Sequence, residues 1–203
     1  MKRVSIMQPT YLPWCGYFGL IQSVDLFIFL DSVQFERRSW QQRNRIKTAS
    51  GPRWLTIPVV SKGKRHQIIR DVAIDNHDNF ADKHLKAIEL NYKNAPYFNT
   101  VFPEIEQILN ISAKNNLADT TIDLIFCLKR LLGNNTPMMR SSDLTANGTK
   151  AELLSSFCEQ VDATEYLAPP GSRGYLESSD AFEKLGITVR YLSFHHPIYP
   201  QLF

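Results

Sequence analysis

The sequence is poor in cysteine, and its three thiols, Cys15, Cys127 and Cys158, stand far apart. An odd, widely spaced set argues against a disulfide framework. It also argues against a zinc knuckle, whose ligands come in close pairs. The metalloprotease pattern HExxH and the serine-hydrolase pattern GxSxG are missing as well. We therefore predict no metal site. The sequence does not identify a cofactor, and a nucleotide is the candidate.

Long apolar runs and a dominant charge are also missing. No run approaches the roughly 20 apolar residues that cross a bilayer, and the N-terminus MKRVSIMQP lacks the length and cleavage site of a signal peptide. We therefore expect a cytoplasmic protein without a transmembrane segment. The net charge is only +3, and apart from KGKR at 62–65 the basic residues are spread among acidic ones. Nucleic acid is thus not an expected partner, whereas a small anionic ligand is.

The apolar residues that are present predict an α/β fold with a mainly parallel, Rossmann-like sheet flanked by helices. RVSIM at 3–7 and DLFIFLDSVQF at 25–35 are rich in β-branched and aromatic residues, and the second holds a continuous apolar run, as expected for buried strands. GYFGLIQSV between them indicates a short helix. Together they predict a βαβ unit. Two further strands are expected in ATEYLAP and ITVRYLSF, each preceded by an amphipathic helix.

We expect residues 1–203 to form a single domain with a hairpin insert at about 37–75 and a helical excursion at about 78–132. Within the insert, QRNRIKT and RWLTIPVV predict two antiparallel strands, and HQIIRDVAID predicts a third. The excursion contains helical patterns at 80–92, 102–113 and 117–132. The segment TPMMRSSDL is interpreted as a connection.

Ligands of a parallel sheet bind beyond the carboxyl ends of its strands, and the loop QPTYLPWCGY follows the first strand. Prolines stiffen this loop, a glycine allows close approach, and its aromatic rings could stack a base or a sugar. Each aromatic side chain could instead simply pack over the carboxyl edge of the sheet. We predict substrate contacts from Gln8, Tyr11, Trp14, Gly16 and Tyr17.

Two later loops fall at the same edge. In APPGSRGYL, Gly171 permits positive φ, Ser172 can donate and Arg173 can pair with phosphate, which predicts an anion nest. Such glycine loops are also common at turns that bind no ligand. RSSDL places Ser141 beside Arg140, where it binds an anion or merely cross-links a turn.

The hairpin region RRSWQQRNRIK is crowded with cations. On a strand, Arg43, Arg45 and Lys47 project from one face and Asn44 from the other. The row is either a solvated strand face or a clamp for pyrophosphate or carboxylate, with Trp40 and Trp54 alongside to stack a ring.

The histidines offer candidate bases. His195 and His196 follow the last strand, where a general base could work near neutral pH. Cys15 could act as a nucleophile with one of them. His84 lies on an amphipathic helix, where a histidine is more often a packing residue than a catalytic one.

Several uncommon segments occur together and in order, among them QPTYLPWCGYFG, ERRSWQQRNRI, NYKNAPYF, TEYLAPPGSRGYL and HHPIYPQ. Through them the chain resembles the WbqC-like family. The resemblance implies a bacterial cytoplasmic protein of O-antigen, lipopolysaccharide or other surface-polysaccharide biosynthesis, with a glycine or related acyl transferase role. It adds Gln34, Tyr92 and Tyr175 to the candidates for substrate binding, and it implies a C-terminal segment beyond Phe203.

The first βαβ unit also resembles HIGH-type nucleotidylyltransferases, which carry a histidine-glycine-histidine loop after the first strand. Here Cys15, Gly16 and Tyr17 stand in that place, so the glycine matches and both histidines are absent. Those histidines steady triphosphate charge, and their loss argues against nucleotidyl transfer.

Three functions remain open. The first is a transferase that moves an acyl or aminoacyl group to a nucleotide- or lipid-linked amino sugar, with an anionic nucleotide sugar or an activated acyl donor as small-molecule substrate. The second is a nucleotidylyltransferase-like enzyme that activates its substrate with ATP. The third is a non-catalytic protein that binds nucleotides or sugars. The oligomeric state is not predicted.

Overall fold

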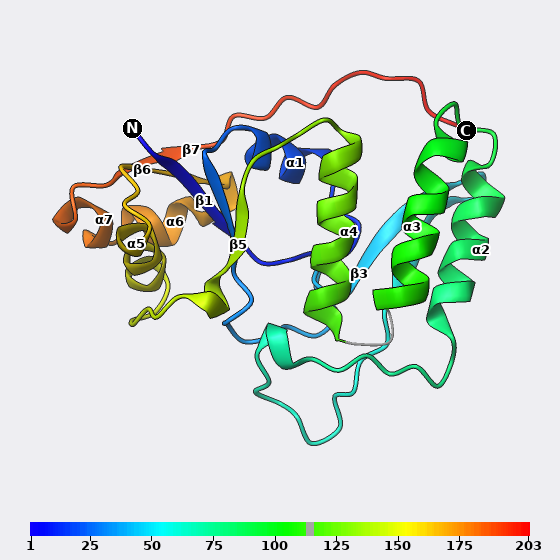
Figure 1. The fold of residues 1–203 in the computed structure, drawn as a ribbon, viewed down its shortest axis with the longest axis horizontal. Helices are drawn as coiled ribbons and strands as arrows, with labels where there is room; N and C mark the ends of the chain where they lie inside the picture. The colour runs from blue at the N-terminus through cyan, green and yellow to red at the C-terminus, as the bar shows by residue number, and fades with distance from the viewer. Residues whose placement is uncertain (113–115) are drawn as a thin grey trace. The chain divides into compact units, whose positions relative to one another are not determined.

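The computed structural model describes residues 1–112 and 116–203 (Figure 1). The chain forms two compact units, which we call the sheet unit and the helix–hairpin unit. The segments of the sheet unit are Met1–Gln8, Trp14–Asp31 and Asn134–His196. The segments of the helix–hairpin unit are Pro9–Pro13, Ser32–Gly133 and Pro197–Phe203. A single domain over both units stays a prediction.

The sheet unit contains five strands in the order β5-β2-β1-β6-β7, and every neighbouring pair is parallel. The strands are β1 (Arg3–Met7), β2 (Leu26–Phe29), β5 (Met138–Arg140), β6 (Glu165–Ala168) and β7 (Thr188–Tyr191). Figure 1 shows β1, β2 and β5 running side by side. The prediction of a mainly parallel α/β sheet is confirmed.

Alternating side chains build the layers of this unit. Val4 and Ile28 lie in one apolar cluster with Phe157 of helix α5 (Ala151–Gln160). On the opposite side of the sheet, Phe27 of β2 packs against Tyr17 of helix α1 (Cys15–Gln22), with ring centroids 5.4 Å apart. Successive residues of a strand point to opposite faces, so the sheet lies between α1 and α5.

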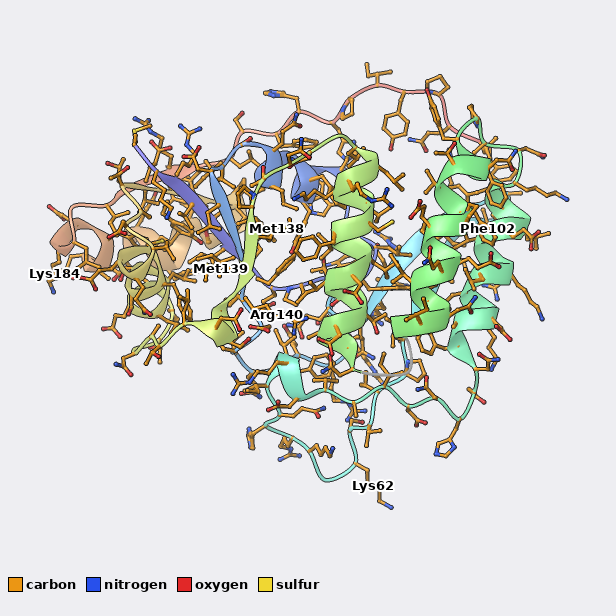
Figure 2. The ribbon with its side chains drawn as sticks, in the orientation of Figure 1. Lys62, Phe102, Met138, Met139, Arg140 and Lys184 are labelled. Carbon is orange, nitrogen blue, oxygen red and sulfur yellow. The ribbon has the colours of Figure 1, made fainter. Side chains whose placement is uncertain are left out.

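The helices of the sheet unit are α1 (Cys15–Gln22), α5 (Ala151–Gln160), α6 (Arg173–Glu177) and α7 (Ala181–Lys184), with 3-10 turns η2 (Ser141–Asp143) and η3 (Pro170–Ser172). Strand β5 and helix α6 were not predicted. The three residues of β5, labelled in Figure 2, include no β-branched side chain, and only their pairing with β2 makes them a strand.

The helix–hairpin unit contains an antiparallel hairpin and three helices. Its elements are β3 (Arg43–Thr48), β4 (Gly51–Thr56), η1 (Ile69–Asp71), α2 (Phe80–Tyr92), α3 (Phe98–Ser112) and α4 (Leu117–Leu131). The three helices lie side by side in Figure 1. The hairpin insert and the helical excursion are thus confirmed.

The third strand expected in HQIIRDVAID is wrong. The segment forms the 3-10 turn η1 and makes only single bridges, one of which joins Ile74 to Val59. Ile69 and Val72 are both fully buried, and their spacing of three residues places them on one side of such a turn. The KGKR run before it is exposed, with Lys62 at the tip of a loop (Figure 2).

Candidate functional site

The strand order fixes where the sheet unit can bind a ligand. From β1 the chain moves to β2 and β5 on one side, whereas β6 and β7 lie on the other. The connections after β1 and β6 therefore diverge at the carboxyl edge, which is the usual binding point of open parallel sheets. Trp14 and α1 follow β1 at this edge, η3 follows β6, and residues 192–196 follow β7.

Two glycines shape the start of α1. The indole of Trp14 folds over Gly16, because a Cβ at that position would stand 2.0 Å from the ring. One turn later, a Cβ at Gly19 would stand 2.7 Å from the ring of Phe194. The two glycines of CGYFG therefore leave a flat strip on α1. The rings of Trp14 and Phe194 rest on this strip.

This packing brings Cys15 and His196 together. The Sγ atom of Cys15 lies 3.3 Å from Nε2 and 3.5 Å from Nδ1 of His196. The imidazole is stacked on Trp14 with centroids 6.1 Å apart, and Phe194 meets both rings edge to face. Cys15 is half-buried at the first residue of α1, and the Trp14 side chain does not cap the helix. Uncapped N–H groups there favour negative charge.

The loop after β6 does not form the predicted anion nest. Gly171 has no positive φ, because Pro170–Ser172 makes a 3-10 turn. Ser172 is buried and donates to the Pro169 carbonyl at 2.7 Å. Arg173 lies 4.1 Å over the Tyr191 ring and donates to Glu177 at 3.0 Å. These two neighbours engage the guanidinium without an external anion.

A buried carboxylate missed by the sequence analysis lies at the ends of β2 and β5. Asp31 has no exposed surface, and its oxygens accept from Ser141 Oγ at 3.1 Å, from the Ser142 N–H at 3.0 Å and from Ser142 Oγ at 2.9 Å. Arg140 lies 3.9 Å away. Asp31 thus ties the two strand ends together, and Ser141 is one of its buried partners. Its position directly after the apolar run FIFL was the available signal.

The remaining candidates of the sheet unit are dispersed. Tyr17 is buried and donates to the Gln8 carbonyl at 3.1 Å, which makes it a core residue beside the edge. Tyr175 is 36% exposed on α6, and burial of part of its ring raises its pKa. His195 is exposed beside His196.

Two other candidates meet inside the helix–hairpin unit. The Tyr11 hydroxyl lies 2.8 Å from Nδ1 of His84, whose side chain is buried. Burial lowers the pKa of His84 to about 4, and a hydrogen bond to the Thr56 backbone opposes this only in part. The ring is therefore neutral near pH 7. Because it donates its one N–H to the Thr56 backbone, its Nδ1 accepts from the Tyr11 hydroxyl. This arrangement supports a packing role for His84.

Asn44 anchors the same loop. Its Nδ2 donates to the carbonyls of Tyr11 at 3.1 Å and Leu12 at 2.6 Å. Leu12 has a φ of 45°, which is unfavourable for a leucine and is held by these bonds. Arg45 is exposed on the other face of β3, and Gln34 bridges to Ile68 through its backbone.

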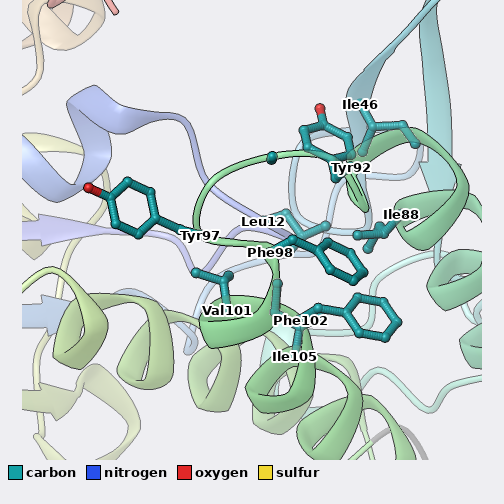
Figure 3. Close-up of a pocket in the computed structure, with 10 residues that line it drawn as sticks. Leu12, Ile46, Ile88, Tyr92, Tyr97, Phe98, Val101, Phe102 and Ile105 are labelled. Atoms are coloured by element: carbon teal, nitrogen blue, oxygen red, sulfur yellow. The ribbon is translucent and has the colours of Figure 1, made fainter. Parts of the chain in front are cut away.

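Tyr92 lines an apolar cavity of about 290 Å³ in the helix–hairpin unit (Figure 3). Its hydroxyl accepts from the Lys47 N–H at 2.9 Å. Figure 3 shows Phe98 and Phe102 of α3 on one wall and Ile46 and Ile88 near Tyr92. The cavity can hold an apolar group, but its lining offers little for bond making.

The fold and this edge define an α/β protein with a parallel sheet and a thiol–imidazole pair at its carboxyl end. The chain belongs to the WbqC-like protein family, which it matches over residues 8–203. It is similar to a protein of Mycobacterium tuberculosis (strain ATCC 25618 / H37Rv) called uncharacterized protein Rv1507c. The two are 38% identical over 194 residues, or 96% of this chain and 83% of the relative. No solved structure matches the chain.

Within residues 1–112 and 116–203, no three histidine, cysteine, aspartate or glutamate side chains gather to hold a metal ion. In the same part of the chain, no helix is both long enough and apolar enough to span a bilayer.

Proposed function

We propose that the protein is a transferase of surface-polysaccharide biosynthesis that moves an acyl or aminoacyl group to the amine of a nucleotide- or lipid-linked amino sugar. The supporting observation is the 3.3 Å contact between Cys15 Sγ and His196 Nε2 at the carboxyl edge. A thiol beside an imidazole is the arrangement of covalent acyl transfer. The segments shared with the WbqC-like family support the biosynthetic setting.

The first half of the reaction charges the cysteine. His196 takes the thiol proton while Sγ of Cys15 attacks the carbonyl carbon of a thioester donor. The C–S bond to the donor breaks, and the departing thiolate takes the proton from His196. Charge that develops on the carbonyl oxygen is favoured by the N-terminus of α1. The product is an acyl group on Cys15 and a free donor thiol.

The second half transfers the group. The amine of the sugar attacks the acyl carbon, the C–N bond forms and the C–S bond to Cys15 breaks. His196 receives the amine proton and returns it to Sγ. Trp14 is 53% exposed, so the part of its indole that Gly16 and His196 leave open can contact the sugar.

The test charges the purified protein with a glycyl or acetyl thioester of N-acetylcysteamine and follows its mass. We expect one acyl group on Cys15, released as an amide when a nucleotide-linked amino sugar is added. His196→Gln slows both steps roughly 100-fold or more. His77→Gln is the matched control, because that side chain is 98% exposed in the helix–hairpin unit. Amide formation by Cys15→Ser at the normal rate contradicts the proposal. Release of pyrophosphate from ATP in place of acylation points to the activating enzyme.

A further inference from the structure

The hairpin has one buried and one open face. Ile46 of β3 and Leu55 of β4 are buried, at 8% and 3% exposure. Arg45 and Trp54 stand opposite each other in the ladder and therefore share the other face. Trp54 is 43% exposed there, and Trp40, just before β3, is 50% exposed.

Two arginines surround these indoles. The guanidinium carbon of Arg43 lies 4.3 Å from the Trp54 ring centroid. That of Arg45 lies 5.9 Å from Trp40 and 5.4 Å from Trp54. The two indole centroids are 5.4 Å apart, and their planes differ by 37°. We call these four side chains the tryptophan–arginine face.

In the described part of the chain, no carboxylate forms an ion pair with Arg43 or Arg45. The Nε atom of Arg43 is buried without a hydrogen-bond partner. Because that atom has no accessible surface, an anion on the open face would pair with the other nitrogens of the guanidinium. The face therefore offers guanidinium donors for a bidentate anion.

The indoles of Trp40 and Trp54 are unusually exposed for tryptophan side chains. A monomeric protein gains by burying a tryptophan, yet two neighbouring indoles stay about half open. Indole surfaces beside guanidinium groups bind a flat ring linked to phosphate, because the ring stacks while the phosphate pairs with arginine. The cluster occupies part of one hairpin, which suits a single nucleotide better than a polymer.

We propose that the tryptophan–arginine face binds a nucleoside diphosphate. The base or ribose stacks on Trp40 and Trp54, and the phosphates accept from Arg43 and Arg45. This site lies in the helix–hairpin unit and uses neither Cys15 nor His196, so it stands whether or not acyl transfer occurs.

The test measures binding by isothermal titration calorimetry with UDP, ADP, uridine, inorganic pyrophosphate and thymidine oligonucleotides of two lengths. We expect UDP or ADP to bind roughly tenfold or more tightly than uridine or pyrophosphate, because both stacking and charge contribute. Trp54→Ala and Arg45→Ala each weaken binding by a similar factor. Circular dichroism establishes that both variants are folded.

Arg53→Ala is the matched control, since Arg53 is an exposed cation of β4 that pairs with Ile46 on the opposite face. It leaves the affinity unchanged. No binding of either diphosphate, or equal losses in Arg53→Ala and Arg45→Ala, overturns the proposal. If pyrophosphate binds as tightly as UDP, the proposed stacking on the two indoles is wrong. If affinity grows with oligonucleotide length, the face is a nucleic-acid surface instead.

Discussion

Protonation of the buried His84 should destabilise the fold in a defined pH range. The imidazole accepts a hydrogen bond from the Tyr11 hydroxyl, and burial lowers its pKa from 6.5 to about 4. In the unfolded chain the ring binds a proton near pH 6.5, whereas in the folded chain it does so only near pH 4. Between these values unfolding takes up a proton. Stability is therefore fully present above about pH 6.5 and is lost as the pH falls toward 4.

The size of the effect follows from the two pKa values. The difference between 6.5 and about 4 corresponds to about 3 kcal/mol of unfolding free energy. This is a large part of the stability of an ordinary domain. His84→Gln keeps a side chain that can both donate and accept but does not titrate, so it removes the contribution.

The assay is urea unfolding of the normal protein and of His84→Gln from neutral pH down to about pH 4, followed by tryptophan fluorescence. Carboxylates titrate in both proteins, so the difference between the two curves isolates His84. We expect the difference to change by about 3 kcal/mol over this range. His77→Gln, whose side chain is 98% exposed, should follow the normal protein. A difference that stays constant with pH would refute the reasoning.

Two further predictions concern the sheet unit. Asp31→Asn leaves one side-chain oxygen for the three groups that donate to Asp31. We expect urea unfolding to show that this variant loses about 3 kcal/mol of unfolding free energy. The control Asp143→Asn, at an exposed position, should change the unfolding free energy little. A loss no greater than that of the control would contradict this role. Gly19→Ala places a methyl group 2.7 Å from the Phe194 ring and should displace that ring. If Phe194 positions His196, charging of Cys15 by the thioester should then slow. The control Gly174→Ala, which has open space around it, should keep the normal charging rate. Equal rates in the two alanine variants would show that Phe194 does not position His196.

Local patterns predicted most of the sheet and the helices. β1 and β6 coincide closely with RVSIM and ATEYLAP, because short segments that contain β-branched and aromatic residues favour strands. Strand β5 was missed since nothing local distinguishes it from a loop. The segment 66–75 was misassigned because β-branched residues spaced three apart fit a 3-10 turn as well as a strand.

The candidate site was only partly predictable. The loops at the carboxyl edge, and Cys15 and His196 within them, follow from strand order and residue chemistry. Their contact is made beside Phe194, which rests on Gly19, a residue 175 positions away, and this packing leaves no local signal. The pairing of Tyr11 with His84 is equally non-local. Each was named as a candidate, but only the fold shows that they share a buried hydrogen bond.

The thiol–imidazole pair is tested most directly by the alkylation rate of each cysteine with iodoacetamide near neutral pH, resolved by peptide mass spectrometry. We expect Cys15 to react roughly tenfold or more slowly in His196→Gln than in the normal protein, because the imidazole no longer accepts the thiol proton. Cys127 and Cys158 are buried and should react slowly and equally in both. The same Cys15 rate in the two proteins would contradict the account.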